Sequence, residues 1–209
     1  MPCETIPRGP LGDDYGFDRG TPLDRWYIER FLAQHREAIR GSVLEVGDPK
    51  YTAQFGQGRV STATIVDVDS ANPQATLIAD LTEPGSLAVE AYDCVILTEV
   101  LHLVASPGLC IENCGAALRG GGSLLVTVPA LKRVSPTHPR SDFWRFTPPG
   151  LELLFHRHWQ GPVSISSFGN LRVCVGFLLA HVVEELEEDD LALNDERFPL
   201  TVAAYAQKQ

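Results

Sequence analysis

Five short apolar runs between residues 42 and 129 constrain the fold more than any other feature of the sequence. They are SVLEV (42–46), TIVDV (64–68), TLIAD (76–80), DCVILTEV (93–100) and GSLLVTVP (122–129). Each run is rich in β-branched and apolar residues, as strands of a parallel sheet that is buried on both faces should be. Between the last two runs, GLCIENCGAALRGGG (108–122) indicates a helix ended by glycines. This alternation predicts an α/β fold with helices on both faces of a mostly parallel sheet.

Four further segments predict how this sheet is completed. From Pro22 the apolar residues recur at helical spacing up to Gly41, which indicates an amphipathic helix. Near the C-terminus, PVSISSF (162–168) alternates like a strand, LRVCVGFLLAHVVEEL (171–186) has helical periodicity, and PLTVAAYAQ (199–207) is a last strand. One apolar face of that helix is expected to contain Val175, Leu178, Leu179, Val182 and Leu186. These segments predict an antiparallel C-terminal strand pair. The acidic run 184–190 is expected to be a solvated helix end, with a partner-binding patch as the alternative.

The chain length and its glycine and proline content predict the domain organisation. A chain of 209 residues with 44% hydrophobic residues can bury one full core. Residues 1–21 are rich in Gly, Pro, Asp and Arg and predict an irregular N-terminal arm, which could close over a binding site as a lid. We expect residues 22–209 to form a single domain.

Charge and cysteine content exclude several classes of partner. The net charge of −10 would repel phosphate backbones and anionic lipid, so neither nucleic acid nor a membrane surface is an expected partner. The five cysteines include no CxxC pair, which favours a reducing compartment. The N-terminal residues have no signal-peptide pattern, and no apolar run reaches membrane-spanning length. The expected location is therefore the cytoplasm.

The candidate ligand site follows the first two strands. Gly47 ends the first strand, where a glycine permits positive φ and close approach of a ligand, and Glu45 can orient this turn or accept from an ammonium group. Asp67 and Asp69 follow Gly47 by 20 and 22 residues (67 − 47 and 69 − 47), a separation suited to binding ribose hydroxyls. Asp69 is preferred because Asp67 is expected to lie within the strand, and Asp80 is placed to accept from the adenine amine. The alternative is a plain glycine turn with an unrelated surface aspartate.

Taken in order, VLEVG, VDVD, IADLT, YDCVILTEVLH and LRGGGSLLVTVP resemble the motifs of class I S-adenosylmethionine-dependent methyltransferases. The resemblance covers roughly residues 40–205 and implies a Rossmann-like seven-stranded sheet, S-adenosylmethionine as cofactor and methyl transfer. More narrowly, YGFDRGTPLDRWYIERFL and SDFWRFTPPGLELLF resemble a subgroup of small bacterial methyltransferases. The cofactor-binding residues implied by the resemblance are Glu45, Gly47, Tyr51, Asp69, Asp80, Leu81 and Thr98.

The first loop departs from the pattern of the wider family. That pattern is E/D-x-G-x-G-x-G, whereas DPKY follows Gly47 here, and Pro49 removes one amide donor. Within the subgroup, Tyr51 or Thr52 would contact the ligand instead, and lost cofactor affinity is the alternative. A nicotinamide dinucleotide would need the G-x-G-x-x-G turn, which the sequence lacks.

Two histidines are candidate bases for methyl transfer to a hydroxyl group. The reaction needs an in-line approach, a desolvated pocket and a base for the acceptor proton. His102 follows the fourth strand and is the first candidate, with a partly buried helix histidine as the alternative; His138 is the second. His156 and His158 indicate a helix end rather than metal ligands, so no metal is expected.

The expected substrate-binding residues come from the arm and from the segment after the fifth strand. Tyr15 and Arg19, together with Arg25, could cap the cleft, although an ordinary surface arm is the alternative. Asp142, Trp144 and Arg145 could close over the substrate, with Arg145 pairing to an acidic or phosphorylated group and Trp144 covering a ring. Alternatively, Trp144 and Phe146 seal a core edge while Arg145 binds Asp142.

The sequence therefore predicts a small-molecule methyltransferase, directed at oxygen, in a biosynthetic or tailoring pathway. The expected partner is a small-molecule substrate, and a homodimer is compatible with the sequence. Two alternatives remain: a methyltransferase-fold enzyme that catalyses cyclisation or elimination, and a non-catalytic partner protein with a degenerate cofactor site.

Overall fold

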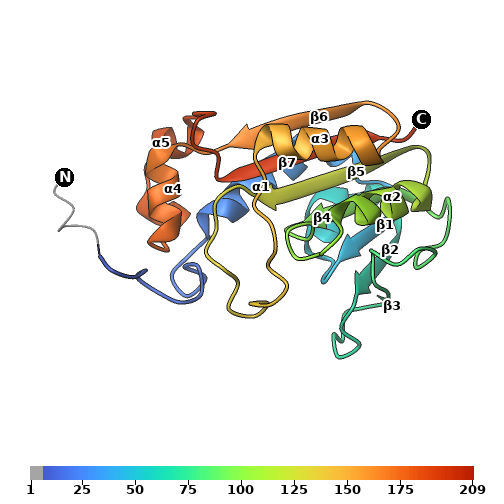
Figure 1. Ribbon diagram of the computed structural model, residues 1–209, viewed down its shortest axis with the longest axis horizontal. Coiled ribbons are helices and arrows are strands. Elements are labelled where there is room, and N and C mark those ends of the chain that lie inside the picture. The colour runs from blue at the N-terminus through green and yellow to red at the C-terminus, as the bar shows by residue number, and fades with distance from the viewer. Residues whose placement is uncertain (1–6) are drawn as a thin grey trace.

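Seven strands form one sheet in the order β3-β2-β1-β4-β5-β7-β6 in the computed structural model, which describes residues 7–209 (Figure 1). The strands are β1 (Gly41–Val46), β2 (Val60–Asp67), β3 (Leu77–Ile78), β4 (Tyr92–Thr98), β5 (Leu118–Pro129), β6 (Val163–Phe168) and β7 (Thr201–Gln207). Strands β1 to β5 pair in parallel, whereas β7 runs antiparallel to both β5 and β6. The predicted fold, a mostly parallel sheet with an antiparallel C-terminal strand pair, is confirmed.

Five helices accompany the sheet within the described residues. They are α1 (Leu23–Gln34), α2 (Pro107–Ala117), α3 (Pro148–His158), α4 (Leu171–Leu178) and α5 (Glu188–Ala192). Helix α2 packs on α3 and both cover one face of the sheet, while α1 lies on the other face (Figure 1). Successive residues of β4 show this division, because Val95 packs in the core under α2 and α3, whereas Ile96 packs in the core under α1.

The segment from β1 to β4 has fewer helices than the predicted alternation of strands and helices requires. A π-helical turn (Thr52–Gly56) and a 3₁₀ turn (Gln57–Arg59) are the helical elements between β1 and β2, and residues 68–76 and 79–91 form turns and bends. Pro73 and Pro84 interrupt these two segments, and proline prevents a helix from continuing through either one. The helix predicted over 108–122 also ends earlier, because Leu118 already pairs with Tyr92 as the first residue of β5.

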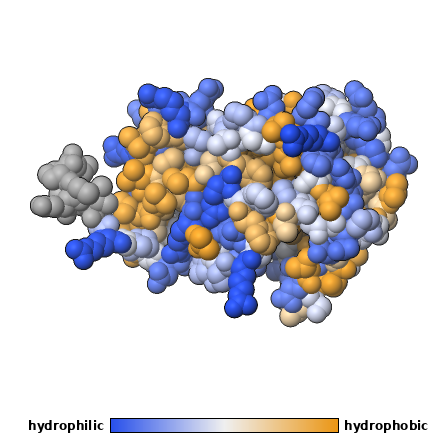
Figure 2. All heavy atoms as spheres, in the orientation of Figure 1, coloured by the Kyte–Doolittle hydropathy of each residue, from blue (hydrophilic) through white to orange (hydrophobic). Residues whose placement is uncertain are grey.

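Helix α4 is half as long as the sequence periodicity predicts, and its predicted apolar face is wrong. The chain leaves the helix after Leu178, and Ala180 takes a left-handed φ of 62°. The buried residues of α4 are Val173, Cys174, Gly176 and Phe177. Val175 and Leu178 are instead 42% and 47% exposed. Figure 2 shows hydrophobic residues on the surface in the region of α4.

The turn at Ala180 redirects the chain towards the N-terminal arm. Val182 forms an isolated bridge with Pro22, and Val183 N donates to the Thr21 carbonyl at 2.8 Å. The Glu184 carboxylate accepts from both the amide and the hydroxyl of Thr21 at 2.9 Å. Part of the acidic run therefore binds the arm, which corrects the prediction that this run is a solvated helix end.

The described part of the arm lies against α4 and the chain that follows it. Leu11 N donates to the Leu179 carbonyl at 2.9 Å, and the Tyr15 ring stacks on Phe177 with centroids 6.0 Å apart. Arg19 donates to the Ala180 carbonyl and pairs with Glu185. Residues 1–6 of the predicted arm lie outside the described residues. Over residues 7–209, every helix is too short or too polar to cross a membrane.

Candidate functional site

The turn after β1 lies where the strand order of the sheet reverses. Strand β1 pairs with β2 on one side and with β4 on the other, and ligands of open α/β sheets bind beyond the strand ends at such a point. Glu45 is 2% exposed, and its two carboxylate oxygens accept from Tyr51 N at 2.9 Å and Thr52 N at 2.7 Å. Burial raises the pKa of Glu45, and these hydrogen bonds oppose that rise. Glu45 therefore holds the turn in place.

Gly47 leaves open space above its backbone. Its φ is 83°, and a Cβ atom built on it would meet no atom within 4 Å. Any other residue would be strained at this φ, and its side chain would fill the open space. The glycine thus permits the close ligand approach that the sequence indicates.

The amide groups of this loop are already engaged within the protein. Acceptors for the amides of residues 47, 48 and 50–53 are Val66 O, Val46 O, Asp48 Oδ1, Glu45 Oε1, Glu45 Oε2 and Pro49 O. Pro49 has no amide hydrogen to donate. No amide of residues 47–53 is therefore left to cradle a pyrophosphate, which disfavours a dinucleotide at this turn.

Tyr51 lies beneath the loop rather than in the open. It is 2% exposed, its hydroxyl accepts from Arg25 Nη1 at 2.6 Å, and burial raises the pKa of Tyr51 to about 12. The hydroxyl thus stays neutral and attaches the loop to the start of α1. Arg25, which we expected at the cleft, lies at this junction.

Asp67, rather than Asp69, is tied to Gly47. Asn72 Nδ2 donates both to the Gly47 carbonyl at 2.6 Å and to Asp67 Oδ2 at 2.7 Å. Asp69 is exposed, and its Oδ1 accepts from Ala71 N at 2.8 Å. Sequence reasoning missed Asn72, although an asparagine five residues after Asp67 is in reach of a local side-chain contact.

The other expected cofactor residues lie at the ends of β3 and β4. Asp80 is exposed, and its Oδ1 accepts from the Thr82 amide and hydroxyl at 2.8 and 2.7 Å. Leu81 is 5% exposed, and its carbonyl accepts from Asn113 Nδ2 at 2.9 Å. Thr98 is the last residue of β4. Of these residues, Leu81 supplies an apolar surface and Asp80 an exposed carboxylate.

His102 is buried and poorly suited to act as a base. It is 2% exposed, and its Nδ1 is buried without a hydrogen-bond partner in the described chain. Burial, followed by the positive charge of Lys132, lowers the pKa of His102 to about 3. Its carbonyl accepts from the amides of Phe143 and Trp144, so the residue anchors the 130–147 loop. His138 lies exposed on that loop, with Nδ1 2.9 Å from Thr137 Oγ1.

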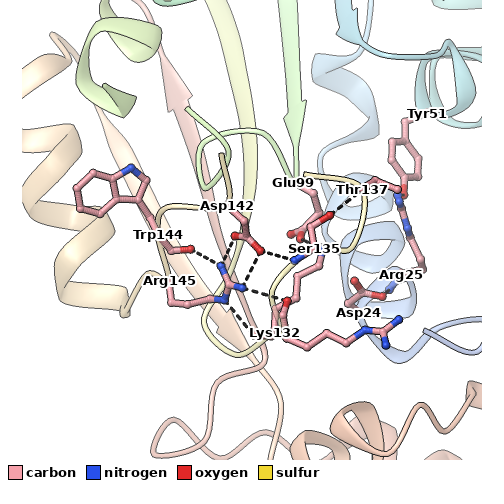
Figure 3. Close-up of polar contacts among 11 residues, drawn as sticks. Asp24, Arg25, Tyr51, Glu99, Lys132, Ser135, Thr137, Asp142, Trp144 and Arg145 are labelled. Atoms are coloured by element: carbon pink, nitrogen blue, oxygen red, sulfur yellow. Dashed lines mark hydrogen bonds and ion pairs between the residues drawn. The ribbon is translucent and has the colours of Figure 1, made fainter. Parts of the chain in front are cut away.

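Asp142 and Arg145 bind each other and organise the same loop (Figure 3). Arg145 donates to both Asp142 oxygens and to the carbonyls of Lys132, Arg133 and Trp144. These contacts use all the N–H donors of the guanidinium group, so an acidic ligand could bind Arg145 only by breaking them. Burial opposes ionisation of Asp142, but the hydrogen bonds from Arg145 and Ser135 outweigh it and lower the pKa of this carboxyl.

Trp144 combines an exposed ring with an anchored nitrogen. The residue is 44% exposed, and its Nε1 donates to the Val104 carbonyl at 2.9 Å. Phe146 is 8% exposed and packs in the core. Sealing of a core edge, one of the two interpretations from sequence, thus describes Phe146 but not the Trp144 ring.

Sequence reasoning missed a buried charge cluster made of Asp24, Glu99 and Lys132 (Figure 3). Lys132 Nζ lies 2.9 Å from Glu99 Oε2, and the two side chains are 13% and 10% exposed. Asp24 is 8% exposed, and burial raises the pKa of its carboxyl. The three residues come from the first turn of α1, the end of β4 and the segment after β5, so no local pattern could join them.

Metal-binding side chains do not gather in the described part of the chain. Residues 7–209 contain no group of three or more His, Cys, Asp or Glu side chains placed to hold an ion. His158 Nδ1 instead lies 2.7 Å from Glu112 Oε1, which joins the end of α3 to α2.

Several solved structures with this fold are S-adenosylmethionine-dependent methyltransferases. No family model matches the chain, and no curated protein sequence matches it. A methyltransferase from Archaeoglobus fulgidus is 14% identical with a TM-score of 0.59, over 88% of this chain and 94% of that one. The N-methyltransferase NodS from Bradyrhizobium japonicum, solved with S-adenosylhomocysteine, is 14% identical with a TM-score of 0.58, over 95% and 94%.

The same fold also serves a different reaction. The cyclase SpnF is 12% identical to this chain with a TM-score of 0.60, over 96% of this chain and 85% of that one. These similarities establish the class I methyltransferase fold that the sequence motifs predict. The narrower bacterial subgroup stays a prediction.

Proposed function

We propose that this chain is an S-adenosylmethionine-dependent methyltransferase that methylates a hydroxyl group of a small molecule in a biosynthetic or tailoring pathway. The observation that carries the proposal is the turn at Gly47, which opens at the reversal point of the methyltransferase strand order. The engaged amides of this turn also favour a ligand without phosphate, as an adenosyl amino acid is.

Residues at three strand ends would hold the cofactor. Its amino-acid part would lie over Gly47 near the Tyr51–Arg25 contact, its ribose at Asp69 or Asp67, and its adenine between Asp80 and Leu81. When bound, the cofactor supplies a methyl group already activated on a sulfonium. The protein then needs to orient the acceptor, exclude water and remove a proton.

The arm would act as the lid of this site. Tyr15 lies against Lys132, with Nζ 5.3 Å from the ring centroid, and against Arg133 at 4.2 Å. Arg19 is bound to Ala180 and Glu185 and would hold the arm closed rather than touch the substrate. Trp144 offers an exposed ring on the neighbouring loop.

Calorimetric titration with S-adenosylmethionine, S-adenosylhomocysteine and NAD tests the cofactor proposal. Both adenosyl ligands should bind with micromolar affinity and NAD should not bind. The variant Gly47→Ala should weaken S-adenosylhomocysteine at least about tenfold, because a methyl group would enter the ligand space. Gly121→Ala is the matched control, since Gly121 also has a left-handed φ, 78°, with open space around it but precedes the core of β5. Absent adenosyl binding, or equal effects of the two substitutions, would refute the proposal.

The likeness to SpnF supports a second candidate, a cyclisation or elimination on the same fold. The mass of the product separates the two reactions, since only methyl transfer adds a methyl group to the acceptor.

A further inference from the structure

Two buried polar atoms near Lys132 lack partners within residues 7–209. They are Glu99 Oε1 and the hydroxyl of Tyr15. Leaving such an atom unpaired in a protein interior is unfavourable, so each calls for a physical explanation. Both belong to residues that contact the same side chain, because Lys132 Nζ pairs with Glu99 and lies over the Tyr15 ring.

We propose that the missing partner is an uncharged hydroxyl group of the methyl acceptor, and that Glu99 receives its proton. The proposal rests on the methyltransferase function proposed above and names its substrate class. It also assigns the base to Glu99, which lies directly after the last residue of β4.

A hydroxyl group fits the two unpaired atoms better than a charged group does. It can donate its hydrogen to Glu99 Oε1 and accept from the Tyr15 hydroxyl at the same time. An ammonium group would bring a second positive charge beside Lys132. A carboxylate or phosphate would meet two buried acids, Asp24 and Glu99.

Lys132 positions the Glu99 carboxylate for this task. Its ammonium group binds Oε2 at 2.9 Å and leaves Oε1 for another donor. The charge of Lys132 also acts on Asp24, which lies on the other side of the cluster (Figure 3). His102 is a weaker candidate, because it is 2% exposed behind the 130–147 loop and burial lowers its pKa to about 3.

The chemical step balances with the proposed cofactor as methyl donor. An oxygen lone pair of the acceptor forms the new C–O bond, and the methyl–sulfur bond breaks with its electron pair remaining on sulfur. The acceptor proton passes to Glu99 Oε1. The products are a methyl ether, S-adenosylhomocysteine and protonated Glu99, which returns its proton to water when the site opens.

The acceptor can reach Glu99 only when the arm moves. Glu99 Oε1 is screened from solvent, and the Tyr15 ring covers Lys132. The Tyr15 ring stacks on Phe177 and lies against the Arg133 guanidinium group. Arg133 also pairs with Asp13 of the arm at 3.8 Å. Displacing the ring would admit the acceptor without disturbing the sheet, and its return would place the Tyr15 hydroxyl against the bound hydroxyl group.

Ligand-observed NMR titration of the full chain with four probes tests the proposal. Phenol carries the hydroxyl, anisole replaces it with a methyl ether, and benzylamine and benzoate carry the two charges. Phenol should bind tightest in the presence of S-adenosylhomocysteine. Glu99→Gln should weaken phenol at least about tenfold and Tyr15→Phe by about 2- to 10-fold, with anisole unchanged in both.

The matched control is Glu90→Gln, which makes the same substitution at the opposite end of β4. Equal binding of phenol and anisole, tightest binding of a charged probe, binding of no probe, or an equal loss in Glu90→Gln would each overturn the proposal. The titrations are repeated without S-adenosylhomocysteine, and its own binding is measured by calorimetry. Calorimetry thus shows whether the cofactor proposal fails, and the probe titrations show separately whether the preference for a hydroxyl group fails. Circular dichroism confirms that each variant is folded, and Glu99→Asp, which keeps the charge, should retain part of the phenol preference.

Discussion

Glu90 and Glu99 flank the same strand, β4, and both have left-handed backbone angles, with φ of 51° and 57°. Their surroundings differ sharply. The Glu90 side chain is 66% exposed and lies 4.0 Å from Lys208, whereas that of Glu99 is 10% exposed and lies 2.9 Å from Lys132. The glutamate at the amino end of the strand is therefore exposed to water, whereas the glutamate at the carboxyl end is enclosed by the protein. Of these two glutamates, the one at the end where ligands bind in this fold is the buried one.

Replacing Lys132 and Lys208, the lysines next to Glu99 and Glu90, should give the largest difference in stability between the two ends of β4. Lys132→Met should lower the free energy of unfolding by about 3–5 kcal/mol, because Asp24 and Glu99 would lose their buried counterion. Lys208→Met should cost about 1 kcal/mol, since this lysine loses one carbonyl contact and a long ion pair. Urea unfolding measures both. Similar losses of unfolding free energy would mean that Lys132 stabilises the buried acids no more than Lys208 stabilises its exposed partner.

Cofactor affinity tests whether the carboxyl ends of the strands form the ligand site. Asp69→Ala should weaken S-adenosylhomocysteine binding by about 1–3 kcal/mol if this carboxylate binds the ribose. Unchanged affinity, together with a loss in Asp67→Ala, would assign the ribose to Asp67, which the Asn72 contacts tie to Gly47. Asp18→Ala, an exposed acid of the arm, is the control in the same calorimetric series.

The same substitution at both glutamates should act in opposite directions. Glycine relieves the cost of a left-handed φ, so Glu90→Gly should leave stability unchanged or raise it by about 1 kcal/mol. Glu99→Gly should instead lower stability by about 2 kcal/mol, because it leaves Lys132 with less buried negative charge. A gain at both positions in thermal unfolding would show that the Glu99 ion pair contributes little.

Acids near the two ends of β4, a partly exposed one and a buried one, should also give opposite pH dependence. Hydrogen bonding from Ser42 N lowers the pKa of Asp93, near the amino end of β4, so its contribution is present above the unfolded pKa and is lost as pH falls through the folded one. Burial raises the pKa of Asp24, so its ionisation costs stability at neutral pH and that cost disappears as pH falls. Unfolding of Asp93→Asn and Asp24→Asn from pH 7 to 3 measures both. Parallel trends against wild type would contradict the assignment.

The strands of the sheet could be predicted because their pattern is local. The buried faces of β1 and β4 require continuous apolar runs, and Gly47 is required where the chain turns with positive φ. Helix α4 could not be delimited in this way, since its apolar periodicity continues past Leu178. The end of the helix depends on the bridge between Val182 and Pro22, which are 160 residues apart (182 − 22).

The candidate site was likewise predictable only where it depends on local sequence. Residues at or just after strand ends, such as Glu45 and Asp80, could be placed at the sheet edge from spacing alone, but their hydrogen-bond partners could not. Arg145 illustrates the difference, because its sequence context suits an anion-binding residue while the folded loop occupies every donor it has.

The sequence by itself determined the order of the strands along the chain, the glycine turn after β1 and the family of folds that this order belongs to. These features depend on side-chain periodicity and backbone freedom, which act within a few residues. Only the tertiary structure decided that Asp24, Glu99 and Lys132 share one buried site and that Tyr15 covers it. Burial and charge pairing arise between segments distant in the chain, so they exist only once the chain has folded.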